Sequence, residues 1–159
     1  MKLYLPRPPR PLLPRRTIPT FHAVPGRSRR DGWTPLRQAE FIGHLAETRS
    51  VSTAARRVQM ARESAYRLRR RPWAESFCAA WDAAMSTATR RRSHGAETLP
   101  RKVTAEELNW RVRSGIWQVR FEAGRYAGVW HKPDNSALLR LLARSGQRGE
   151  VPPPTDRAE

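Results

Sequence analysis

Cysteine is almost absent from the sequence: Cys78 is the only one in 159 residues. A single thiol excludes an internal disulfide framework and any zinc site made of several thiolates, and it fits a reduced compartment. Long apolar runs are also missing, because the patch Leu3–Leu5 is cut short by Pro6 and no run approaches the length of a membrane span. We therefore expect a cytoplasmic protein with no membrane partner.

Acidic residues are scarce as well. Asp and Glu total 14 against 31 Lys and Arg, which gives a net charge of +17. No glycine-rich phosphate loop is present, and no nucleophile or carboxylate stands at a telling spacing from the four histidines, His22, His44, His94 and His131. The sequence therefore predicts no enzyme, no catalytic residue, no metal site and no cofactor.

The positive charge points to a polyanionic partner, because each cation placed near a phosphate releases condensed counterions. Arginine supplies 28 of the 31 basic residues, and part of that excess is typical of a GC-rich genome. Genome composition does not explain why the charge is concentrated in the first thirty residues and again between Arg49 and Arg71. In the second region eight arginines stand against one acid, Glu63. Double-stranded DNA is the expected partner, and a nucleoid-associated location in a bacterial cell is expected with it.

The stretch Val51–Arg70 is predicted to form two short helices with a tight turn at Gln59, which is a helix-turn-helix. The small Ala55 suits a close crossing of the two helices. Apolar residues fall where both helices must pack inward, at Ala54, Val58, Met60, Ala65 and Leu68. A basic helix held by a small apolar underside is what insertion into the major groove requires.

Candidate DNA-binding residues follow from this arrangement. The outward face of the second helix is expected to meet base edges or groove walls through Arg62, Glu63, Tyr66, Arg67 and Arg70. Contacts that position the DNA backbone are expected from Ser52, Thr53, Arg56, Arg57 and Arg69. Ser64 and Arg71 complete the predicted set.

Two further helices are expected to pack around the motif. One runs from Pro35 to about Glu47 with Thr34 as its N-cap, and either Ser50 or Ser52 caps the helix that follows it. The other runs from Ala74 to about Thr87 and carries an apolar core stripe formed by Phe77, Trp81 and Met85.

In the C-terminal half, the spacing of apolar residues changes from the helical period to alternation. Thr104 opens a capping box and a short helix that stops near Gly115. Residues 117–122 then alternate, and a two-residue loop at Ala123-Gly124 predicts a hairpin with Phe121 opposite Tyr126, Glu122 opposite Arg125 and Trp117 opposite Trp130. A last helix, Ser136 to about Arg144, holds four leucines, which indicates either contact on two sides or a well-buried helix.

The expected fold is therefore mostly α: a homeodomain-like helix-turn-helix bundle, then a helix, a short β-hairpin and a C-terminal helix. Residues 1–31 are rich in Arg and Pro, and their apolar islands are predicted not to form a core. This disordered tail is either an electrostatic arm along DNA or a solvated extension. The remaining units are the DNA-binding domain 32–89, a basic linker 90–103, the packing or oligomerisation region 104–145 and a second disordered tail 146–159.

A set of residues spread over roughly 32–144 matches the pattern of a known group of proteins. These residues are Gly32-Trp33-Thr34-Pro35, Gln38, Phe41-Ile42, Ser50-Val51-Ser52, Ala54-Ala55-Arg56, Met60, Arg62-Glu63-Ser64-Ala65-Tyr66, Phe77, Ala80-Trp81-Asp82, Asp134-Asn135, Leu138-Leu139 and Leu141-Leu142. Through them the chain resembles a group of helix-turn-helix proteins common in alphaproteobacteria, which in turn is similar to the small subunit of phage terminases and to the helix-turn-helix part of insertion-element transposase accessory proteins. The resemblance implies a DNA-recognition component, a homo-oligomer, and a packaging ATPase or another protein as a partner of the C-terminal half.

Two positions depart from the family pattern. The turn residue that is usually Gly is Gln59 here, and a left-handed conformation at a non-Gly residue costs roughly 1 kcal/mol. The serine that usually caps the second helix is Ala61, which forgoes about 1 kcal/mol.

Two classes of function stay open. The first is DNA binding, either terminase-like with a higher-order oligomer, or as a transcriptional regulator that binds a two-fold site as a dimer. The second is an interaction protein whose C-terminal half binds another protein while the basic motif holds nucleic acid non-specifically.

Overall fold

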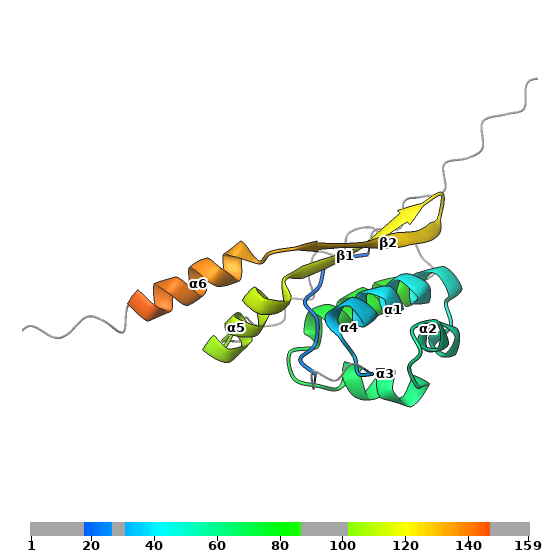
Figure 1. Cartoon of the computed structure of the whole chain (residues 1–159), viewed down its shortest axis with the longest axis horizontal. Helices are drawn as coiled ribbons and strands as arrows, with labels where there is room; N and C mark the ends of the chain where they lie inside the picture. The colour runs from blue at the N-terminus through cyan, green and yellow to red at the C-terminus, as the bar shows by residue number, and fades with distance from the viewer. Residues whose placement is uncertain (1–17, 27–30, 87–101, 147–159) are drawn as a thin grey trace, which may run out of the picture.

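The computed structural model describes residues 18–26, 31–86 and 102–146. Within these ranges six helices and one two-stranded hairpin follow one another (Figure 1). They are α1 (Pro35–Thr48), α2 (Val51–Arg57), α3 (Arg62–Arg69), α4 (Glu75–Met85), α5 (Ala105–Ser114), β1 (Ile116–Glu122), β2 (Arg125–Lys132) and α6 (Asn135–Gly146). The fold is mostly α, in the predicted order. Most of the predicted linker and all of the C-terminal tail after residue 146 lie outside the described residues.

Helix α1 organises the N-terminal bundle. Its N-cap, Thr34, accepts a hydrogen bond from a backbone amide of the first turn, and Pro35 occupies the first helical position, where a missing N–H costs little. The buried face of α1 packs against α4, with the rings of Phe41 and Trp81 4.9 Å apart. Met85 was predicted for this core but is 39% exposed. That part of the prediction is wrong, because Met85 is the last residue of α4.

Helices α2 and α3 form the helix-turn-helix. Ser50 caps α2, and the Met60 amide closes the turn by donating to the Ala55 carbonyl over 2.9 Å. Gln59 adopts a left-handed φ of 59°, and Ala61 caps α3 without a side-chain hydrogen bond. Gln59 therefore adopts a backbone conformation that favours glycine, and α3 begins without the side-chain cap that a serine would supply. The underside is closed by the buried residues Ala54, Ala55, Val58, Ala65 and Leu68.

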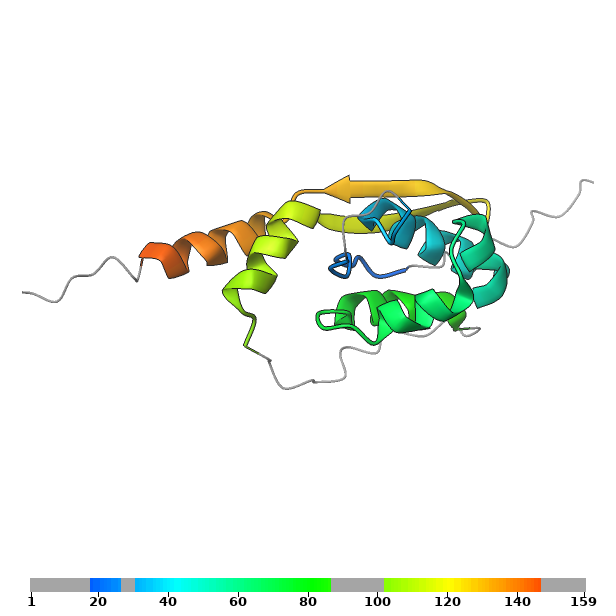
Figure 2. The same cartoon turned by 60° about the horizontal axis from the view of Figure 1, so that its bottom comes forward.

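Residues 18–26 are packed, so the prediction of a disordered tail is wrong for this segment, which Figure 2 shows in blue between the hairpin and the helices. Phe21 is fully buried and meets the edge of Phe77 at 5.8 Å between ring centroids. The backbone of Phe21 forms an antiparallel bridge with Trp117 through hydrogen bonds of 3.1 and 2.9 Å. The side chain of Gln38 binds both the amide and the carbonyl of Val24, at 2.7 and 2.9 Å. Residues 1–17 and 27–30 lie outside the described residues.

The hairpin turns at Ala123 and Gly124, whose φ angles of 48° and 78° are both positive, as a two-residue type I′ turn requires. One face of the hairpin packs on α1. The approach is closest at Gly43, where an added Cβ would collide with the ring of Tyr126. The absence of a side chain at Gly43 therefore lets the hairpin lie flat on the helix.

The hairpin register differs from the prediction in its outer half. Trp117 pairs with His131 and not with Trp130. The ladder contains a bulge in which Ala127 is the extra residue before Gly128, and an extra residue on one strand moves the pairs that follow by one position. The prediction is confirmed for the two pairs nearest the turn and wrong beyond the bulge.

The two C-terminal helices begin at side-chain caps. Thr104 accepts a hydrogen bond from the Glu107 amide at 3.2 Å, and Asp134 accepts one from the Ala137 amide at 2.9 Å. Helix α6 packs beside α5 and extends away from the bundle (Figure 1). Of the two alternatives predicted for this helix, the well-buried one is wrong, because Leu138, Leu139 and Leu142 are 40%, 66% and 56% exposed. Contact on two sides, one of them with another subunit, stays a prediction.

Candidate nucleic-acid interface

Helix α3 lies on the opposite side of the bundle from the hairpin (Figures 1 and 2). Ala65 and Leu68 are 0% and 1% exposed and hold the helix down. Tyr66 is 42% exposed, with its ring 5.6 Å from that of Trp81. All five side chains predicted for the outward face are exposed: Arg62, Glu63, Tyr66, Arg67 and Arg70.

Three exposed arginines keep their guanidinium groups available. Within the described residues, the side chains of Arg56, Arg67 and Arg70 make no hydrogen bond or ion pair. Arg62 has a loose pair with Glu63 at 3.4 Å, with both side chains more than half exposed. The pKa of Glu63 is lowered, first by a hydrogen bond from its own backbone amide and then by the two neighbouring arginines of α3. Its ionised carboxylate could accept a hydrogen bond from a cytosine amino group.

Arg57 is anchored to the protein. Its guanidinium forms an ion pair with Glu47 of α1 and lies 3.3 Å from Nδ1 of His44. The hydrogen bond from Arg57 lowers the pKa of Glu47, and burial together with the charge of Arg57 lowers the pKa of His44. At neutral pH the pair therefore links α1 to α2, and the predicted phosphate contact from Arg57 remains a prediction.

Two arginines near the end of α3 are also held internally. Arg69 donates to Asp82 at 2.7 Å, and its Cζ lies 5.3 Å from the ring centroid of Trp81. Arg71 donates to the carbonyl of Pro25 at 3.0 Å. These contacts hold α3 against α4 and against segment 18–26. The first role of both residues is therefore to keep the interface in position.

The predicted hydroxyl groups divide in the same way. Ser52 is exposed at the start of α2. The hydroxyl of Thr53 donates to the capping serine of α2 at 3.1 Å. The hydroxyl of Ser64 donates to the carbonyl of Ala61 at 2.6 Å and accepts from the indole of Trp33 at 3.1 Å. Ser52 is therefore the hydroxyl of the set with most freedom to reach a phosphate.

Trp33 and Gln38 position this interface but were not predicted as part of it. Trp33 holds the first turn of α3 through Ser64, and Gln38 ties segment 18–26 to α1. The role of Gln38 could have been predicted from the sequence, because it is a polar residue on the apolar stripe of α1, four residues before Ile42. A polar residue at a buried helical position needs a hydrogen-bonding partner from another part of the fold.

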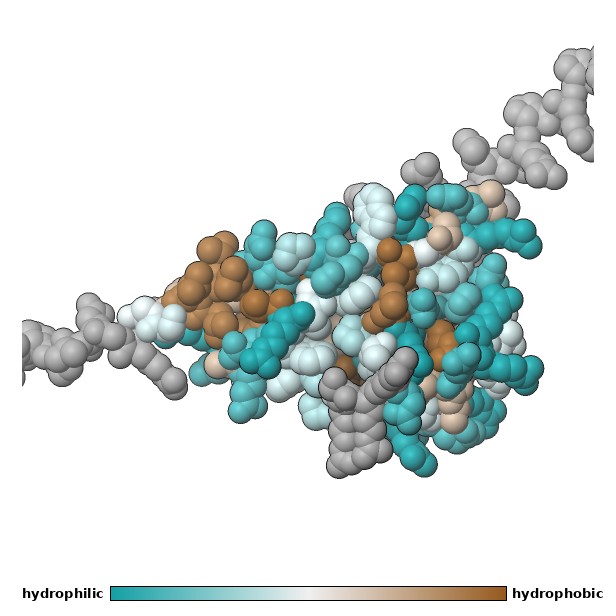
Figure 3. All heavy atoms as spheres, in the orientation of Figure 1, coloured by the Kyte–Doolittle hydropathy of each residue, from teal (hydrophilic) through white to brown (hydrophobic). Residues whose placement is uncertain are grey.

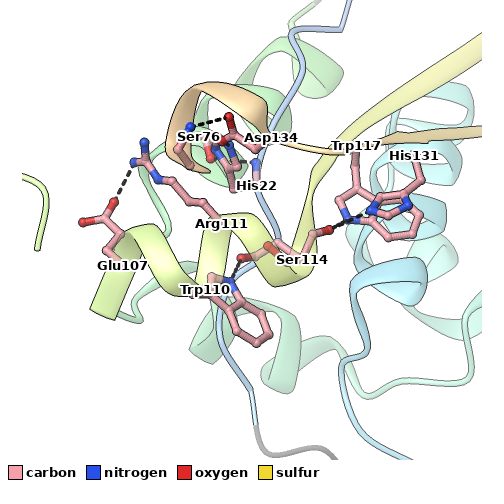
Figure 4. A network of polar contacts seen from close by, with 11 residues as sticks. His22, Ser76, Glu107, Trp110, Arg111, Ser114, Trp117, His131 and Asp134 are labelled. Carbon is pink, nitrogen blue, oxygen red and sulfur yellow. Dashed lines mark hydrogen bonds and ion pairs between the residues drawn. The ribbon is translucent and has the colours of Figure 1, made fainter. Parts of the chain in front are cut away.

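A separate network of polar contacts joins segment 18–26 to α4 and α6 (Figure 4). Nε2 of His22 lies 2.7 Å from Asp134, while the backbone amide of His22 donates to Ser76 at 3.0 Å. Because Ser76 contacts the backbone and not the imidazole, the three residues do not form a nucleophile and base pair. Burial would raise the pKa of Asp134, but hydrogen bonds from the Ala137 amide and from His22 lower it overall. The network is structural.

Neither a metal-binding cluster nor a membrane-spanning helix occurs among the described residues. Residues 18–26, 31–86 and 102–146 contain no group of three or more His, Cys, Asp or Glu side chains that could hold a metal ion. No helix in this part of the chain is long and apolar enough to cross a membrane. Comparisons with protein-family models, with curated proteins and with solved structures find no match. The chemistry of α3 is therefore the strongest indication of function.

Proposed function

We propose that the chain binds double-stranded DNA by placing α3 in the major groove. The observation that carries the proposal is the exposed set Arg62, Arg67 and Arg70 on a short helix whose other side is buried through Ala65 and Leu68. The major groove admits an α-helix, and arginine is the side chain that most often pairs with a guanine edge. Arg67 and Arg70 would reach base edges without first breaking an internal contact.

The backbone of the duplex would be held from α2. Arg56 and Ser52 are exposed on this helix, and contacts of this kind set the register of the protein without reading sequence. Three anchored arginines would keep α2 and α3 in place: Arg57, Arg69 and Arg71. Their positive charge would also attract the DNA, although their internal partners partly screen it. The net charge of +17 supports the encounter with a polyanion.

The test is a titration of the full-length chain into a labelled 20-base-pair duplex at several salt concentrations. We expect the logarithm of the affinity to fall linearly with the logarithm of salt concentration, with a slope between about −1 and −4, because each neutralised phosphate contributes roughly −0.9. Exposed Arg56 supplies one phosphate contact, and each of the exposed residues Arg62, Arg67 and Arg70 adds another where it meets a phosphate and not a base edge. A slope near zero would contradict the proposal.

We also propose that two copies of the chain associate through α6. Figure 3 shows an apolar patch on this helix, formed by Leu138, Leu139 and Leu142. A two-fold axis brings the same patch of two copies together. The patch is on the order of a few hundred Å², below the roughly 800 Å² per partner of a stable interface. The dimer would therefore be weak in isolation, which favours a regulator binding a two-fold site over a terminase-like ring with a packaging ATPase.

Replacing Leu139 and Leu142 by lysine tests this association. We expect light scattering to show a concentration-dependent dimer for the unchanged chain and a monomer for the variant. Burying the lysine ammonium groups costs free energy, and the lysines of the two copies repel each other. Arg140→Ala, on the same helix, is the matched control and should leave the dimer in place. A chain that stays monomeric at about 100 µM, well above the µM range of weak interfaces, would point to another protein as the occupant, and a DNA-independent higher-order ring would favour packaging.

A further inference from the structure

The β1–β2 hairpin has two chemically different faces. Its inner face packs on α1 and on the core through Val119 and neighbouring aromatic residues. Side chains alternate along a strand, so the residues between them point away from the bundle. The outer face carries Gln118 and Arg120 of β1 beside Trp130 and Lys132 of β2. This outer face lies on the side of the molecule opposite α3 (Figures 1 and 2).

Trp130 is the centre of the outer face. Its indole is 49% exposed although tryptophan is highly buried on average. The guanidinium carbon of Arg120 lies 4.9 Å from the ring centroid, and Nζ of Lys132 lies 5.6 Å from it. Two cations thus stand at a flat aromatic surface that no other element of the described chain covers.

The charges on this face match a polyanion. Arg120, Lys132 and Arg125 are exposed. Two acids stand against these three cations: Glu122 is paired with Arg120 at 3.1 Å, and the charge of Arg125 contributes to the lowered pKa of Glu47. If the two cation–π contacts served only to stabilise the hairpin, the indole would not need to face solvent. An exposed aromatic ring with cations over its face combines the two groups by which proteins stack bases and neutralise the adjoining phosphates.

We propose that the outer face of the hairpin is a second nucleic-acid-binding surface, which stacks an unpaired base of a single strand on Trp130 and neutralises the flanking phosphates with Arg120 and Lys132. A base inside a duplex is already stacked on both sides, so Trp130 selects a strand with accessible base faces. A stacked base takes the place of one cation at the ring, and that cation moves to the phosphate. This surface is independent of α3, so one chain can hold a duplex and a strand on opposite sides.

The test uses the full-length chain and two labelled 20-nucleotide strands, oligothymidine and an abasic strand with the same number of phosphates. We expect Trp130→Ala to weaken binding of oligothymidine by roughly 5- to 100-fold, which is the range for loss of one base–aromatic stack. The same variant should bind the abasic strand as well as the unchanged chain does, because no base is present to stack. Trp130→Phe should give an intermediate loss, and Lys132→Gln should weaken both strands equally.

Leu36→Ala is the matched control, because Leu36 is another large and strongly exposed apolar side chain, at 46%, and lies outside both proposed surfaces. It should leave the affinity for oligothymidine within twofold of the unchanged chain. Affinity of Trp130→Ala for duplex DNA should also stay within twofold, so a failure of the hairpin surface can be told apart from a failure of α3. Equal loss on the thymidine and abasic strands, or no loss with either Trp130 variant, would overturn the proposal. Thermal unfolding shows whether Trp130→Ala folds, and Trp130→Phe decides the matter if it does not.

Discussion

The double variant Arg67→Ala/Arg70→Ala is expected to bind duplex DNA about 100-fold more weakly than the unchanged chain, since each lost contact to a base edge is worth about 1–3 kcal/mol. Neither side chain has an internal partner in the described structure, so the loss reports on DNA and not on stability. The salt slope should become shallower by about two units if both arginines meet phosphates. If they meet bases, the loss will depend on the DNA sequence. Fluorescence anisotropy at several salt concentrations measures both quantities.

Arg113→Ala/Arg140→Ala is the control for charge. Both residues are exposed on the C-terminal helices, and this variant loses the same net charge as the α3 variant. We expect it to weaken duplex binding by less than about fivefold, in keeping with long-range electrostatics alone. Equal losses in the two variants would show that affinity follows net charge, and the proposed role of α3 would be wrong.

Phe21→Ala is expected to lower the free energy of unfolding by about 3–5 kcal/mol, the usual cost of removing a fully buried phenylalanine. Phe21 has 0% exposure and lies against Phe77, so the substitution leaves a cavity between α4 and the hairpin. Urea denaturation followed by circular dichroism measures the change.

Leu139→Ala serves as the comparison for Phe21→Ala. This leucine is 66% exposed, so at a protein concentration that keeps the chain monomeric its truncation should change the free energy of unfolding by no more than about 0.5 kcal/mol. A loss below about 1 kcal/mol for Phe21→Ala would show that segment 18–26 contributes little to the fold in solution, because buried phenylalanines cost several times more.

The helices could be predicted because each carries its own period and its own cap. Thr34, Ser50 and Thr104 stand where the structure places N-caps. Segment 18–26 carries neither signal. Ile18, Phe21 and Val24 fill a surface that α1, α4 and the hairpin make together, and no local pattern records such a surface.

The exposed face of α3 could be predicted from the helical period, but the fate of individual arginines could not. Arg57 and Arg69 find their partners ten and thirteen residues away in the sequence, on other helices. Those contacts depend on the angles at which the helices cross, and helix propensity does not determine these angles. The hairpin bulge is a similar case, because one extra residue at Ala127 moved every later pair and turned Trp130 to the open face.

The bridge between Phe21 and Trp117 has a consequence for synthesis on the ribosome. Segment 18–26 emerges before the helices, and α1 and α4 can bury part of it soon afterwards. Its strand-like backbone finds a partner only when β1 has been made, and the His22 contact waits for Asp134, 112 residues later. Long-range contacts of this kind slow folding. A nascent chain that ends after α4 would carry an unpaired edge at Phe21, and the bundle would be completed from its C-terminal half.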